Sequence, residues 1–326
     1  MQHPPRQSPS IEVGLSISSL RRFRPAPPSN SLLPNVLIPG VSHAGAAMLA
    51  ADLGRHPDVC LPDVKQINYF TPLRFGRPVE SPLDDYDRHY SRWSGERYRV
   101  ETGPDYFDGG LPMTTRIAES LPGVHVVLLL RDPAHRLWTS YVDKLARGRL
   151  PRAMSYETYI DRCLALRSNR AERFEGNRHF RTFSSGFYVE FLPDWLEAFG
   201  RRVLVVFTED LQDEPGAGVR DVLTWLDLDP ATSNPPAGEE GETGGYPPSE
   251  SSSLSLNRRL WSLPQRTPAP WLEPAAGAIA AVRRIPRQSE RTLARVRSLY
   301  AAANNELGHV LRGHGLQSLP GWVLQG

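Results

Sequence analysis

The sequence predicts an α/β fold built on a parallel sheet, with helices on both faces. Short β-like runs alternate with helical runs along the chain, as they do when crossover helices join parallel strands. The run HVVLLL, His125 to Leu130, is apolar throughout, which is typical of a strand buried on both faces. Finally, the stretch VLIPGVSHAGAAMLA joins an apolar run to a helix-forming run through a glycine-bearing turn. Such a turn can bind an anion, because free backbone N–H groups and the helix dipole point into it.

The remaining elements follow in order from local signals. Pro133 favours a helix start and Gly200 a helix end, and apolar residues at helical spacing predict a long C-terminal helix. The expected strands are 36–38, 97–101, 125–130 and 202–207. The expected helices are 46–55, 133–147, 187–200 with a break near Pro193, 218–226 and 289–311, the last with Leu293, Val296, Tyr300, Leu307 and Leu311 on its apolar face.

Composition narrows the class of protein. The chain has 326 residues, 40% hydrophobic and 23% charged, with a net charge of +2, which favours a globular protein without a nucleic-acid partner. No apolar run approaches the roughly 20 residues of a membrane span, and the N-terminus lacks the pattern of a signal peptide. Two cysteines without ligand spacing favour a reducing compartment, so we expect a cytoplasmic protein. Of the 38 basic residues, only Lys65 and Lys144 are lysines, an excess of arginine typical of a GC-rich genome.

The predicted organisation is one domain with a tail. Residues 1–33 are rich in Pro, Ser and Arg, a composition typical of disorder, and residues 34–326 form the domain. Within it, Asp229 to Ser255 is rich in Pro, Gly, Ser and Glu, which predicts a mobile loop or lid. The sequence does not predict an oligomeric state.

A second informative segment, LLLRDPAHRLWTSY, follows the strand that ends at Leu130. Arg131 emerges at the carboxyl end of that strand, where open α/β sheets bind ligands. A guanidinium with the Thr139 hydroxyl nearby suits a phosphate monoester, because its N–H groups match the phosphate oxygens. The residues alone leave a second interpretation open, in which Arg131 pairs with Asp132 at a structural corner.

Several segments together resemble the sulfotransferase family, whose sulfuryl donor is 3′-phosphoadenosine 5′-phosphosulfate (PAPS). RDPAHRLWTSY is similar to the family's Arg-Asp-Pro-x-x-Arg-x-x-Ser-x-Tyr segment, which holds the 3′-phosphate of the donor. GVSHAGAAML stands where the family has its phosphosulfate loop, Gly-x-x-Lys-x-Gly-Thr-Thr-x-Leu. RHPDVCLPDVKQINYF, ETGPDYF, the helix before Gly200 and LYAAANNELGHVL follow in family order, from about Val36 to Trp322. The resemblance implies a three-layer α/β/α domain with a P-loop-like turn, PAPS as co-substrate and no metal.

The resemblance also implies which residues form the site. The nucleotide is expected at Ser42, His43, Ala44, Gly45, Ala46, Ala47, Arg131 and Thr139, and catalysis at His43, Lys65 and Gln66. His43 stands at the position of the loop lysine, two alanines replace the loop hydroxyls, and Gln66 replaces a glutamate that acts as base in many relatives. The Lys and Thr of the family's Glu-Lys-Thr-Pro become Thr102 and Gly103. Asp63, Glu101 and Asp105 are nearby carboxylates that could replace the missing base, although a solvated surface or helix-capping role is expected for each.

The predicted function is sulfuryl transfer from PAPS to a hydroxyl or amine of a small-molecule or saccharide acceptor. His43 would replace the loop lysine only when protonated, so transfer is expected to slow as pH rises through an imidazole pKa near 6.5. The alternative is a protein of sulfotransferase fold that binds the nucleotide without sulfating, or that performs other acid–base chemistry. A P-loop NTPase is disfavoured because the Gly-Lys-Ser/Thr motif is absent.

Overall fold

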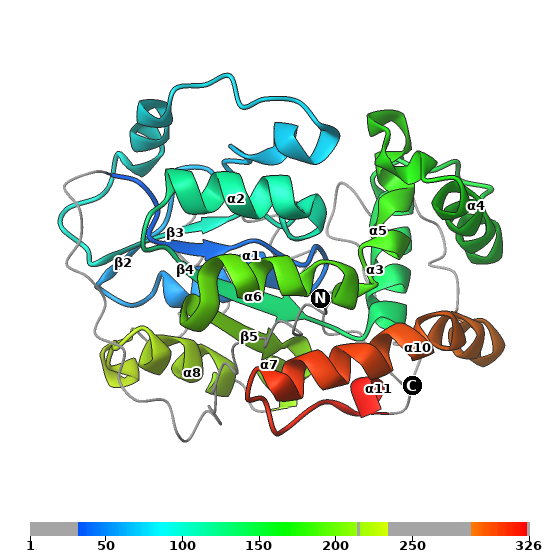
Figure 1. Ribbon diagram of the computed structural model, residues 1–326. Helices are drawn as coiled ribbons and strands as arrows, with labels where there is room; N and C mark the ends of the chain where they lie inside the picture. Colours follow the sequence, from blue (N-terminus) through cyan, green and yellow to red (C-terminus); the bar gives the residue numbers. More distant parts are fainter. Residues whose placement is uncertain (1–31, 214–215, 234–287, 325–326) are drawn as a thin grey trace, which may run out of the picture.

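A parallel sheet forms the centre of the protein, as Figure 1 shows. The structure, a computed structural model, describes residues 32–213, 216–233 and 288–324. Across the sheet the strands run in the order β2 (Val59–Cys60), β3 (Tyr98–Thr102), β1 (Val36–Ile38), β4 (His125–Leu130) and β5 (Val203–Phe207). Neighbouring strands are all parallel, and every strand residue is buried. The predicted α/β fold with a central parallel sheet is therefore confirmed.

Helices cover both faces of this sheet. They are α1 (Ala46–Leu53), α2 (Leu111–Ser120), α3 (Pro133–Ala146), α4 (Tyr156–Ser168), α5 (Arg181–Ser184), α6 (Leu192–Phe199), α7 (Thr208–Asp213), α8 (Ala217–Trp225), α10 (Glu290–Gly313) and α11 (Gly321–Leu324). From β1 the chain crosses towards β2 through α1, whereas from β3 it crosses in the opposite direction towards β4 through α2. Because such crossovers are right-handed, α1 and α2 lie on opposite faces. Helix α1 packs against α8, and α2 packs against α6.

The strands and helices agree with the sequence-based expectation to within two or three residues. The break expected near Pro193 is confirmed: a short 3-10 helix at Tyr188–Glu190 ends before α6 begins at Leu192. The sequence pattern missed β2, α2 and α4, and also the short helices α5, α7 and α11. The predicted tail falls outside the described residues except for 32–33, and so does the predicted lid except for 229–233. In the described parts of the chain, no helix is both long and apolar enough to cross a membrane.

The strand order decides where a ligand can bind. The connections that leave β1 and β4 run towards opposite edges of the sheet, although these two strands are neighbours. The loops at their carboxyl ends therefore diverge and leave a crevice, which is where open α/β sheets bind ligands. The loop after β1 and the segment that begins at Arg131 meet at this position, so the two most informative sequence segments come together.

A buried cluster of charges fixes the opposite wall of the crevice. The Asp108 carboxylate accepts hydrogen bonds from Arg74 Nη2 at 2.7 Å and from Arg181 Nε at 2.8 Å. Arg74 belongs to the 3-10 helix η2 (Thr71–Phe75), and Arg181 begins α5. Burial alone would raise the pKa of Asp108, but Arg74 and Arg181 hold that pKa below its usual value. The carboxylate thus joins η2 and α5 to the end of β3.

Replacing this carboxylate is expected to destabilise the fold. Asp108→Asn leaves the Arg181 guanidinium without its counter-charge and leaves Arg74 with Asp105 alone. Breaking a buried pair in this way costs about 3–5 kcal/mol. Because the folded-state pKa is depressed, the stabilisation is present at neutral pH and is lost as pH falls below the ordinary value of 3.8. Urea denaturation at pH 7 and in acid measures both effects.

Asp161→Asn is the matched control. Asp161 accepts from Arg295 at the same distance of 2.7 Å, but both side chains are largely exposed, where ion pairs contribute little. Equal urea midpoints for the two variants at pH 7 would contradict the role assigned to Asp108.

Candidate active site

The crevice contains a cavity of about 830 Å³, a size that accommodates a nucleotide-sized ligand. Its walls come from the loop after β1, the ends of β3 and β4, and from η2, α3 and α5. The 3-10 helix η6 (Glu175–Phe180) completes the wall next to α5. Of the residues predicted for the site, these line the cavity: Ser42, His43, Gly45, Ala46, Ala47, Lys65, Gln66, Arg131 and Thr139.

Ala44 is the exception among the predicted nucleotide ligands. Its side chain is fully buried in the core, and it is absent from the cavity wall. Its carbonyl oxygen accepts a hydrogen bond from Thr208 Oγ1 at 2.7 Å. The chain turns at this point, because His43 has a positive φ of 65° and Gly45 one of 101°, so Ala44 faces inward while its neighbours face the cavity.

The loop after β1 presents backbone donors to the cavity. Gly45 precedes α1 as its N-cap, and Ala46 and Ala47 form its first turn. The first N–H groups of a helix have no acceptor within the helix, and they carry part of the positive end of the helix dipole. Because all three residues line the cavity, this turn has the means to hold an anion without side-chain hydroxyls.

Arg131 lines the cavity and is not part of an ion pair with its neighbour Asp132. Asp132 does not pair with it. The Asp132 carboxylate instead accepts from Ala134 N and contacts His135 at 3.0 Å and Arg297 at 3.3 Å. The Arg131 guanidinium donates to the carbonyl of His43 at 3.0 Å and has no ion pair within the described residues. The interpretation that Arg131 pairs with Asp132 is therefore wrong.

Arg136, by contrast, does not reach the cavity. Its side chain is 0% exposed and donates to the carbonyls of Ser42 at 3.2 Å and Thr182 at 2.6 Å. The guanidinium also lies over the ring of Tyr188. Arg136 and Arg131 thus hold two successive carbonyls of the loop, which fixes the backbone of the loop where it lines the cavity.

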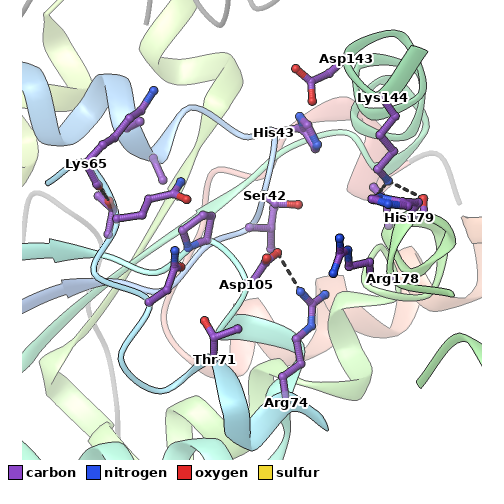
Figure 2. Close-up of a pocket in the computed structure, with 18 of the residues that line it drawn as sticks. Ser42, His43, Lys65, Thr71, Arg74, Asp105, Asp143, Lys144, Arg178 and His179 are labelled. Atoms are coloured by element: carbon purple, nitrogen blue, oxygen red, sulfur yellow. Dashed lines mark hydrogen bonds and ion pairs between the residues drawn. The ribbon is translucent and has the colours of Figure 1, made fainter. Parts of the chain in front are cut away.

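His43 lies on the cavity wall between charged neighbours, with Asp143 beside its imidazole in Figure 2. Loss of hydration on burial lowers the pKa of His43 to about 4; Asp143 opposes this shift, while Lys144 and Arg136 reinforce it. His43 is therefore neutral at pH 7, and its pKa lies well below the value near 6.5 on which the expected pH dependence was based. A neutral imidazole is suited to accept a proton.

Lys65 and Gln66 lie across the cavity from α3. Lys65 is buried at the cavity wall, Gln66 is exposed, and Thr102 Oγ1 donates to the Lys65 carbonyl at 2.7 Å. The structure also explains why glycine follows Thr102. A Cβ on Gly103 would lie 2.1 Å from the ring of Tyr106, so the tyrosine ring occupies the space that a side chain at position 103 would need.

Of the nearby carboxylates, Glu101 differs from the solvated or helix-capping role expected for it. Glu101 is fully buried and accepts hydrogen bonds from Tyr86 and Tyr106, while burial raises its pKa to about 7. Asp105 lines the cavity in an ion pair with Arg74 at 2.8 Å, and its side chain is 45% exposed. Asp63 is partly exposed and pairs with Arg92.

Sequence reasoning missed the cations on the α3 side of the cavity. Lys144 is buried and donates to Tyr159 Oη, the His179 carbonyl and Thr182 Oγ1, and burial lowers its pKa to about 7. Figure 2 shows it opposite Lys65. The two lysines of the chain both line this cavity. The rarity of lysine in a chain rich in arginine is the sequence signal that could have identified Lys144 as a site residue.

The comparisons with known proteins agree with this geometry. The sulfotransferase from Alicyclobacillus acidocaldarius has a similar structure, with a TM-score of 0.53 and 21% identity, covering 70% of this chain and 94% of that chain. This chain has the sulfotransferase fold. The sequence is also 29% identical to the bifunctional heparan sulfate N-deacetylase/N-sulfotransferase 1 of Caenorhabditis briggsae, over 62% of this chain and 24% of that protein. The Caenorhabditis elegans protein of the same name is 27% identical, over 60% and 22%.

The predicted resemblance to sulfotransferases is therefore confirmed. The chain spans only about a quarter of the length of the curated relatives it matches. No protein-family model matches the sequence. These findings show the sulfotransferase fold, whereas the activity and the acceptor are inferred from the site itself.

We expect the His43 imidazole of the free protein to titrate near pH 4, because the surrounding protein disfavours its charged form. Its ring-proton NMR shift as a function of pH, assigned with His43→Gln, measures this value. Bound PAP, the desulfonated donor, is expected to raise it by placing negative charge at the loop. A midpoint near 6.5 in the free protein would contradict this expectation and favour the role in which protonated His43 replaces the loop lysine.

Proposed function

We propose that this chain transfers a sulfuryl group from PAPS to a hydroxyl or amine of a saccharide or small-molecule acceptor. The observation that supports this most strongly is the meeting of the loop after β1 with Arg131 and Thr139 in one cavity. Sulfotransferase relatives add independent support. Heparan sulfate in the names of two relatives favours a saccharide among the possible acceptors.

The residues present fit an anionic nucleotide. Eight cationic side chains line the cavity against three carboxylates: Lys65, Arg74, Arg77, Arg131, Lys144, Arg147, Arg149 and Arg178 against Asp105, Asp143 and Glu175. In our proposal, the N–H groups of Gly45, Ala46 and Ala47 hold the 5′ end of the donor. Arg131 and Thr139 hold its 3′-phosphate, as the family resemblance implies.

The transfer requires a group that accepts a proton. The acceptor oxygen or nitrogen forms a bond to sulfur while the bond from sulfur to the phosphate oxygen breaks, and PAP leaves with that electron pair. The acceptor's proton must pass to a base, and an amide at Gln66 cannot take it. We assign this role to His43, which is neutral and lies beside Asp143. The loop's own N–H groups and Lys65 remain to balance charge on the leaving group.

The second candidate function is nucleotide binding without efficient sulfate transfer. Its support is the loop itself, in which no permanent positive charge stands at position 43 and no carboxylate at position 66. In this case the protein binds PAP or PAPS and transfers sulfate poorly or not at all.

The first test of the proposed function is selective binding of PAP. PAP is expected to bind more tightly than AMP, which lacks the 3′-phosphate. Arg131→Ala should weaken PAP about 10- to 100-fold, because a charge-assisted hydrogen bond to the 3′-phosphate is lost. It should weaken AMP by a smaller factor, because the variant also loses the hydrogen bond to the His43 carbonyl that supports the loop. Isothermal titration gives the four dissociation constants.

Arg201→Ala is the control, since Arg201 is exposed and absent from the cavity wall. Thermal unfolding of each variant confirms that the fold is intact. Equal affinities for PAP and AMP in the wild type would remove the basis for the Arg131 assignment.

The second test is sulfate transfer from PAPS to an acceptor panel of amino and neutral sugars and phenols. If His43 is the base, His43→Ala should lower kcat about 100-fold or more while the PAP dissociation constant changes by less than about 3-fold. The wild-type rate should not fall between pH 6 and pH 8, because His43 is already neutral there. Retention of full activity by His43→Ala would refute its catalytic role.

The double variant His43→Lys/Gln66→Glu separates the two candidate functions. It restores both catalytic groups of the family. Transfer by this variant together with an inactive wild type would favour the nucleotide-binding alternative, whereas an active wild type that depends on His43 favours the enzyme.

A further inference from the structure

The mouth of the cavity carries a group of exposed arginines that is separate from the loop. Arg147 and Arg149 lie just beyond the end of α3, Arg178 lies in η6, and Arg77 follows η2. All four are exposed and line the cavity. We call these four residues the arginine rim. Three separate segments of the fold supply it, so the tertiary structure brings the charges together.

The rim has more positive charge than its own carboxylates neutralise. Arg147 Nε contacts Asp143 at 2.7 Å. Glu175 is shared between Arg77, at 3.3 Å, and Arg178, at 3.9 Å. Arg149 has no ion pair within the described residues. Four guanidinium groups therefore face two carboxylates, and one of these, Glu175, is exposed.

We propose that the arginine rim is a second anion-binding subsite, which holds a carboxylate or sulfate group that belongs to the acceptor. The proposal rests on the proposed function and specifies its substrate class: an acceptor that is itself anionic. A guanidinium fork matches both anions, because each presents paired oxygens to its N–H groups. The donor is assigned to different residues, the loop and Arg131, which lie inside the cavity and are not exposed at its mouth.

Glu175 occupies the position that an acceptor anion would take. It lies between Arg77 and Arg178 and joins the two sides of the mouth. An incoming carboxylate or sulfate must displace it, so Glu175 competes with the ligand. This competition leads to an unusual expectation: removal of a charged cavity residue should strengthen binding of an anionic acceptor.

The test measures binding of three hexasaccharides to the full chain, with and without saturating PAP. Chitohexaose with N-acetylated sugars is neutral, a hyaluronan hexasaccharide carries carboxylates, and a heparin hexasaccharide carries sulfates as well. The two anionic probes are expected to bind at least 10-fold more tightly than the neutral one. Arg178→Ala and Arg149→Ala should each weaken them several-fold, and Glu175→Gln should tighten them several-fold.

Helix α2 offers matched controls. Arg116 and Glu119 form an i,i+3 pair at 3.8 Å with similar exposure to the pair Arg178 and Glu175 at 3.9 Å, but they are absent from the cavity wall. Arg116→Ala and Glu119→Gln change the net charge by the same amounts. They are expected to leave the affinity for both anionic probes unchanged. This result would show that the rim variants act through a local binding site and not through the net charge of the protein.

Three results would overturn the proposal: equal affinity for neutral and anionic probes, no weakening in the rim variants, or no tightening in Glu175→Gln beyond that in Glu119→Gln. Failure of the proposed function is a distinct outcome. In that case PAP itself does not bind, while the anionic hexasaccharides still bind and still depend on the rim. Comparison of the two anionic probes shows whether carboxylates suffice or sulfates are required.

Discussion

Two buried guanidinium groups hold the loop on which the rest of the site depends. Arg131 donates to the carbonyl of His43, and Arg136 donates to the carbonyl of Ser42. With both carbonyls engaged, the backbone of the loop is fixed where Gly45, Ala46 and Ala47 line the cavity. The loop therefore keeps the means to bind an anion although alanines replace its hydroxyls, because backbone groups do not depend on the side chains at those positions.

The same arrangement changes the chemistry expected at position 43. A lysine there would bring a permanent charge into a region that already contains Arg131, Arg136 and Lys144. The imidazole of His43 avoids that charge, since burial and the neighbouring cations keep it neutral. Positive charge is instead distributed over other elements of the cavity, from Lys65 at one wall to the arginine rim at the mouth. A neutral base beside a strongly cationic cavity is compatible with transfer to an anionic acceptor.

The parts of the site that follow a strand end were predictable. Arg131 comes directly after a fully apolar strand, and the loop after β1 has its own glycines, so local sequence was enough to place both at the carboxyl edge of the sheet. Lys144, Arg149 and Arg178 were not predictable in this way. They lie one helix or more away from any strand end, and only the packing of α3, α4 and α5 brings them to the cavity. Glu101 was misjudged because its hydrogen bonds to Tyr86 and Tyr106 come from the folding of the segments before and after β3, which the strand pattern does not specify.

The sequence by itself determined the sheet, the loop and the order of the family segments, because strand burial, helix starts and tight turns are governed by neighbouring residues. Only the tertiary structure decided the ionisation of His43, the inward position of Ala44 and the pairing of Asp132 away from Arg131. Each of these depends on what surrounds a group in space. Local pattern specifies which element a residue belongs to, whereas solvation and charge are set by neighbours that the fold brings from elsewhere in the chain.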